Sequence, residues 1–234
     1  MQSLGTAPGV SALAWLLLIV GIDVAHVWAT LYRTYLRDDA RRRQRNLLLT
    51  APLVAWILGA VLYSLGPGVF WRALAYVAVF HFVRQQYGIL RMYYRHERDV
   101  PKRVHLVRSA AIYLATLWPL TYWHTHPRAF DWFIPGDFVF SDAAWLSDIA
   151  WISDVVGVAY LIVLFAHAAQ ELSTWRQSGR FNVPANLVLG GTALSWWVGI
   201  VLYDADLIFT LTNVASHGVP YIALVWLDHR RSTA

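Results

Sequence analysis

The stretch that decides the fold is Phe80–Gly88, FHFVRQQYG, inside a run from about Val69 to Tyr93 that otherwise has the composition of a membrane-spanning helix. Histidine, arginine and glutamine side chains are costly in hydrocarbon, by about 2.5–3.5 kcal/mol for a central charge on insertion scales. A helix that keeps such residues is therefore expected to bury them against polar partners. Two other apolar runs, Gly21–His26 and Asn213–Pro220, carry polar residues at a similar depth. We therefore expect these three helices to converge.

The composition of the chain is that of an integral membrane protein. Of its 234 residues, 58% are hydrophobic and 14% are charged, against roughly 45–50% and 25% in soluble domains. The apolar runs follow one another with short gaps, which predicts a single all-α domain over residues 1–234. Because the chain has no cysteine, disulfides, thiolate metal sites and iron–sulfur clusters are excluded.

The apolar runs predict seven transmembrane helices in a polytopic, multi-pass membrane protein. Their approximate bounds are Gly9–Tyr35, Leu47–Leu65, Val69–Tyr93, Leu106–His124, Ile149–Ala169, Ala185–Tyr203 and Leu207–Leu227. With seven crossings the arginine-rich loops all fall on one side, which by the positive-inside rule is the cytoplasm. The amino terminus is then outside, the carboxyl terminus is cytoplasmic and the location is the cell inner membrane. The net charge of +5 comes from basic residues in short loops between the apolar runs, a pattern that orients a membrane protein. We therefore expect no nucleic-acid partner.

Each of the three converging helices carries a polar stripe. Residues three or four apart share a helix face. The stripes are Asp23, His26, Thr30 and Arg33 in the first helix, His81, Gln85 and Gly88 with Arg84 beside them in the third, and Thr210, Asn213, His217 and Tyr221 in the last. At 1.5 Å per residue from the predicted ends, His26, His81 and His217 lie near mid-membrane.

Metal ligation would explain why three imidazoles lie at one depth, because a metal–nitrogen bond offsets the free-energy cost of removing each imidazole from water. We predict His26, His81 and His217 as ligands of a non-haem transition metal, with iron favoured. Asp23 is either a fourth ligand or an acceptor for the second nitrogen of a histidine, the role expected of Asn213. The alternative is that each histidine only joins two helices by a hydrogen bond, worth about 0.6 kcal/mol in membranes.

Other polar residues have less defined roles. We expect Gln85 to orient the site, whereas Arg84 is a candidate for binding an acidic group of a substrate. His124 and His126 fit an interfacial position at the outer end of the fourth helix. His167, one turn before Glu171, is an ambiguous candidate for a site.

The three histidine motifs resemble those of a known family. Asp23 with His26 in the first helix, His81-Phe82 in the third and His217 in the last give a layout similar to the Brp/Blh-type β-carotene dioxygenases. In those polytopic bacterial proteins, intramembrane histidines are thought to hold a non-haem iron that cleaves a carotenoid with O2. The resemblance implies an O2-dependent enzyme acting on a hydrophobic substrate.

We therefore predict a membrane-bound metal-dependent oxidoreductase that oxidises or cleaves a hydrophobic small molecule, such as a carotenoid or a lipid, within the lipid bilayer. One alternative is a haem-binding electron-transfer protein in which two of the histidines are axial ligands. Another is a transporter or proton relay that uses Asp23, His26, Arg84 and His217. A purely structural membrane subunit is the fourth reading.

Overall fold

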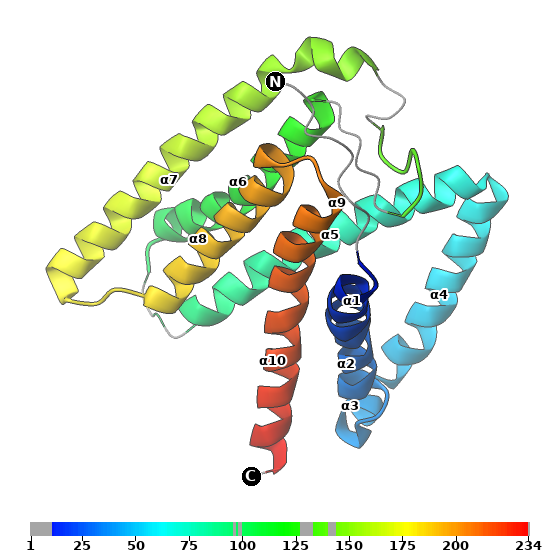
Figure 1. Cartoon of the computed structure of the whole chain (residues 1–234). Coiled ribbons are helices and arrows are strands. Elements are labelled where there is room, and N and C mark those ends of the chain that lie inside the picture. Colours follow the sequence, from blue (N-terminus) through cyan, green and yellow to red (C-terminus); the bar gives the residue numbers. More distant parts are fainter. Residues whose placement is uncertain (1–10, 96, 98–99, 127–132, 140–143, 234) are drawn as a thin grey trace.

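The computed structural model of the chain describes residues 11–95, 97, 100–126, 133–139 and 144–233, and every regular element within them is helical (Figure 1). The first helical segment comprises α1 (Ala12–Trp15), the π-helical η1 (Leu16–Val24) and α2 (Ala25–Thr34). The predicted start of this segment, at Gly9, lies outside the described residues. The remaining elements are α3 (Asp38–Arg43), α4 (Arg45–Ser64), α5 (Pro67–Tyr94), α6 (Lys102–Thr125), η3 (Ala144–Ile149), α7 (Trp151–Ser178), α8 (Val183–Trp196), η4 (Trp197–Leu202), α9 (Asp206–Phe209), η5 (Thr210–Val214) and α10 (Ala215–Thr233).

Within the described residues, five helical segments are long and apolar enough to cross a membrane. They are Leu16–Thr34, Arg45–Ser64, Trp151–Ser178, Val183–Leu202 and Leu207–Arg230. The most telling of them is α4, in which no residue is buried and large side chains such as Trp56 (71% exposed) point outward. A helix whose large apolar side chains are mostly exposed is stable only if lipid or another protein covers them, which suits a bilayer.

The seven-helix prediction is confirmed only in its coarser part. A helix forms over each predicted range, but α5 and α6 are not among the five segments apolar enough to span. Polar residues lower the hydropathy of both helices: α5 contains His81, Arg84, Gln85 and Gln86 in its middle, and α6 contains His105 and Arg108. A count of seven crossings and the predicted orientation stay predictions.

The chain is organised around α5. This helix packs against α4 on one side and against α6 and α8 on the other, while α6 also contacts α7. In Figure 1, α2 and α10 run side by side and stand at a clear angle to the layer formed by α5, α6, α7 and α8. One apolar core surrounds Phe82 and Val83, and a second surrounds Leu90 further along α5. The predicted histidine helices therefore meet where α2 and α10 approach the middle of α5.

Three turns are set by local chemistry. Gly66 adopts a φ of +135° before Pro67, which opens α5 at a position where its missing N–H is not needed. Gly179 ends α7 in the left-handed region with a φ of +66°. Asn182 caps α8, since its side-chain oxygen accepts a hydrogen bond from the backbone N–H of Ala185 at 3.2 Å.

Candidate metal centre

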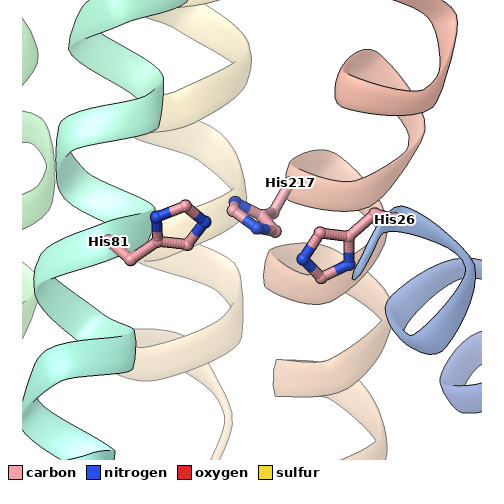
Figure 2. A group of neighbouring side chains, drawn as sticks. All are labelled: His26, His81 and His217. Atoms are coloured by element: carbon pink, nitrogen blue, oxygen red, sulfur yellow. The ribbon is translucent and has the colours of Figure 1, made fainter. Parts of the chain in front are cut away.

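The three predicted histidines come together. His26 from α2, His81 from α5 and His217 from α10 each offer a ring nitrogen, and these nitrogens all lie within 4.8 Å of one another. Figure 2 shows His217 between the other two rings. The centroid of the His217 ring lies 4.8 Å from that of the His26 ring and 5.0 Å from that of the His81 ring, and both pairs of rings are edge-on. Residues separated by more than 190 positions in the sequence thus form one cluster.

Two of the three histidines lie within one turn of the end of a π-helical segment. The segment η1 ends at Val24, two residues before His26, and η5 ends at Val214, three residues before His217. A π-helical turn is rare, costs regular i→i+4 hydrogen bonds and often occurs at functional sites. It changes the direction in which the following side chains project. The straight α-helices assumed in the sequence analysis did not include these turns.

His217 is the most enclosed member of the cluster. It is fully buried, and its ring stacks on that of Phe82 at a centroid distance of 3.9 Å. Neither Nδ1 nor Nε2 of His217 makes a hydrogen bond with any described residue. A buried polar group without a partner costs about 1–3 kcal/mol, so this ring is placed for a ligand that its nitrogens could bind.

Asp23 lies where it could orient the ring of His26. Asp23 Oδ1 lies 3.4 Å from His26 Nδ1, although the geometry is not that of a hydrogen bond. In metal sites, the nitrogen that does not bind the ion commonly faces a carboxylate or a carbonyl. One helical turn after His26, the hydroxyl of Thr30 donates to the hydroxyl oxygen of Tyr221 at 3.0 Å, and this bond joins α2 to α10.

Gln85 reaches the cluster through the backbone. Its Nε2 donates to the carbonyl oxygen of His217 at 2.7 Å, so it ties α5 to the turn of α10 that carries the histidine. This contact fits the orienting role that the sequence predicted. His81 itself is exposed, as is its neighbour Phe80 (64% exposed), which leaves the His81 side of the cluster open at the protein surface.

The other two predicted residues make different contacts. Arg84 donates a hydrogen bond to the hydroxyl of Tyr113 on α6 and lies over the ring of Tyr87, so its contacts lead away from the histidines. Asn213 is buried, and its Nδ2 donates to the carbonyl oxygen of Phe209 at 3.3 Å and to Thr212 Oγ1 at 3.1 Å. Its Oδ1 has no hydrogen-bond partner among the described residues.

Two glycines allow the helices to approach closely. A Cβ atom on Gly218 would lie 2.5 Å from Ile22 Cγ2 and 3.3 Å from the Ile22 carbonyl oxygen. A Cβ on Gly199 would lie 2.3 Å from Asn213 Nδ2. Small residues at such crossings let membrane helices pack backbone to backbone. Gly218 directly follows His217, and this His-Gly pair is the signal in the sequence from which the close crossing could have been predicted.

His167 belongs to a different cluster. Its Nε2 lies 3.0 Å from Asn186 Oδ1, and Asn186 Nδ2 donates to Glu171 Oε2 at 3.0 Å. Glu171 also accepts a hydrogen bond from Arg108 at 3.2 Å. This network lies between α6, α7 and α8, and His167 is not part of the histidine group of the described residues that could hold a metal.

Three neutral imidazoles in one place have a definite chemistry. They suit iron, zinc, copper or nickel, whereas magnesium and calcium prefer oxygen ligands. Nitrogens bound tetrahedrally at about 2.1 Å from one ion lie roughly 3.4 Å apart. The present spacing of up to 4.8 Å would have to shorten to that value when an ion binds.

Comparisons with known proteins neither support nor oppose a metal site at the three histidines. No family model, no curated protein and no solved structure matches the chain significantly. The likeness to the Brp/Blh-type dioxygenases therefore rests on His26, His81, His217 and their neighbours, as a resemblance of layout.

Proposed function

We propose that the protein is a membrane-embedded enzyme in which His26, His81 and His217 hold one non-haem transition metal, iron by preference, for O2-dependent oxidation or cleavage of a hydrophobic substrate. A carotenoid or a lipid is the substrate class in keeping with the resemblance described above. The observation that supports the proposal most is the convergence of three imidazoles within 4.8 Å around a buried His217 whose two nitrogens lack hydrogen bonds to the described residues.

The surrounding residues have separate tasks in this proposal. A bound metal would supply a Lewis-acid and redox centre to which O2 and substrate are brought. Asp23 orients the ring of His26 from the Nδ1 side, and Gln85 fixes the backbone of His217. Phe82 covers one face of the His217 ring and keeps water from it. The exposed side of His81 gives an apolar substrate access from the bilayer.

The proposal includes seven crossings of the cell inner membrane, with the amino terminus outside and the carboxyl terminus in the cytoplasm. For α5 and α6 to cross, their interior arginines need partners, and two are present: Arg84 bonds to Tyr113 and Arg108 to Glu171. Reporter fusions after Gly66 and after Asp206 should both be external. If either fusion is cytoplasmic, the seven-helix topology is wrong.

The cofactor class decides between the enzyme and its main alternative. Protein purified in mild detergent without chelators should contain about one non-haem metal ion per chain and lack haem absorbance in the visible region. A stoichiometric haem spectrum would instead indicate electron transfer. Absence of any metal would favour a transporter or proton relay through Asp23, His26, Arg84 and His217, or a structural subunit.

A further inference from the structure

A second site lies between α7 and α8, apart from the three histidines. Its cavity has a volume of about 370 Å³, within the range of cavities that bind drug-sized molecules. Most of its wall is apolar, from residues that include Leu164, Leu172, Trp175 and Leu189. The polar residues of the wall are His167, Glu171 and Asn186.

Hydrogen bonds fix the proton on His167. Asn186 Nδ2 donates both to Glu171 Oε2 at 3.0 Å and to the carbonyl oxygen of Asn182 at 2.9 Å, which identifies Oδ1 as the acceptor of this amide. His167 Nε2, 3.0 Å from that Oδ1, must therefore carry the hydrogen. In the neutral ring, Nδ1 is left as an acceptor.

This acceptor is buried and unused. His167 is only 4% exposed, and its Nδ1 makes no hydrogen bond with the described part of the chain. Both oxygens of the Glu171 carboxylate are already occupied, because one accepts a hydrogen bond from Arg108 and the other accepts one from Asn186. An anionic ligand would be repelled by the Glu171 carboxylate, and an ammonium group would lose its hydration for little gain. A neutral hydrogen-bond donor fits best.

We propose that this cavity binds an apolar molecule bearing a single hydroxyl group, whose O–H donates to His167 Nδ1 while its hydrocarbon part fills the space beside Trp175 and Leu189. The inference does not depend on the metal centre, because His26, His81 and His217 are not among the residues that line the cavity. It adds a binding site for a neutral amphiphilic alcohol.

The cavity offers a matched pair of variants for its test. Gly190 lines the cavity and Gly191 does not, yet a Cβ on either would meet nothing within 4 Å. Both sit in a helix interior, where leucine is favoured over glycine. Gly190→Leu should therefore fold and fill the cavity, and Gly191→Leu should fold and leave it open.

Binding can be measured with 11-bromoundecanol, whose bromine quenches tryptophan fluorescence, on protein in lipid nanodiscs. We expect saturable quenching that is largely lost in Trp175→Phe and in Gly190→Leu but kept in Gly191→Leu. His167→Phe should weaken binding of the alcohol by up to about tenfold, with no effect on the methyl ether of the same chain, which lacks the O–H donor. Equal binding of alcohol and ether to the unmodified protein, or unchanged binding in Gly190→Leu, would overturn the proposal.

Discussion

Alanine at any one of His26, His81 or His217 should remove nearly all metal from the purified protein, and activity should be lost with it. Each of the three rings offers a nitrogen within 4.8 Å of the others, and two remaining ligands should no longer hold the ion. Removing two histidines together should be little worse than removing one, because ligands that act as a unit are not additive. Metal analysis normalised to folded protein measures this.

Histidines with other partners serve as controls. His124 lies 2.7 Å from the hydroxyl of Tyr76, and His229 lies 3.1 Å from that of Tyr32, so His124→Ala and His229→Ala should keep the metal. Three histidines that merely join helices would instead give small, additive losses of stability and no common loss of metal. Asp23→Asn should lower metal affinity by roughly 10–100-fold, the effect of removing an orienting partner.

The crossing of η1 with α10 offers a variant that leaves every histidine in place. Gly218→Ala puts a methyl group 2.5 Å from Ile22 Cγ2 and 3.3 Å from the Ile22 carbonyl oxygen, and we expect this crowding to push η1 away from α10 and to separate His26 from His217. Metal occupancy should fall although no ligand has changed. Ile22→Ala in the same chain removes the colliding methyl group and should restore part of the occupancy.

The second large effect is expected at the buried ion pair. The side chains of Arg108 and Glu171 are only 7% and 6% exposed, and Arg108 also bonds to Glu97 at 2.6 Å. Arg108→Met would leave the Glu171 carboxylate buried without its charged partner. Removing one partner of such a pair costs about 3–5 kcal/mol of the free energy of unfolding, measurable by unfolding in detergent followed by tryptophan fluorescence.

An exposed pair provides the comparison for this variant. Arg41 and Asp38 form an ion pair in which the side chains are 58% and 74% exposed, and Arg41→Met should cost less than about 1 kcal/mol. Arg108→Met combined with Glu171→Met should be less damaging than the sum of the two single changes, because no unpaired carboxylate remains at position 171. An Arg108→Met protein as stable as Arg41→Met would contradict this account of the pair.

The convergence of the histidines was predictable because membrane helices are long and their polar faces are few. On apolar helices, the polar stripes containing His26, His81 and His217 were expected to face protein, and with three such stripes a common meeting point could be predicted, although His81 itself is exposed. The contact of Gln85 with α10 followed from the same reasoning, since it shares a face with His81.

Other parts of the site depend on features that hydropathy does not encode. The π-helical segments η1 and η5 are distant in sequence and contact each other, and hydropathy indicates neither the segments nor their contact. The stacking of Phe82 on His217 needs the crossing angle of α5 and α10, which polar periodicity leaves open. Arg84 shares the neighbourhood of His81 in sequence, yet its bond to Tyr113 turns it toward α6, a choice set by the position of that helix.

X-ray absorption at the metal edge, on protein purified without added metal or chelator, tests the metal centre most directly. The account predicts about one ion per chain with three imidazole nitrogens at about 2.0–2.2 Å, and loss of one of these scatterers or of the whole signal in His217→Ala. A metal-free protein, a porphyrin spectrum, or an imidazole signal unchanged in His217→Ala would contradict the account.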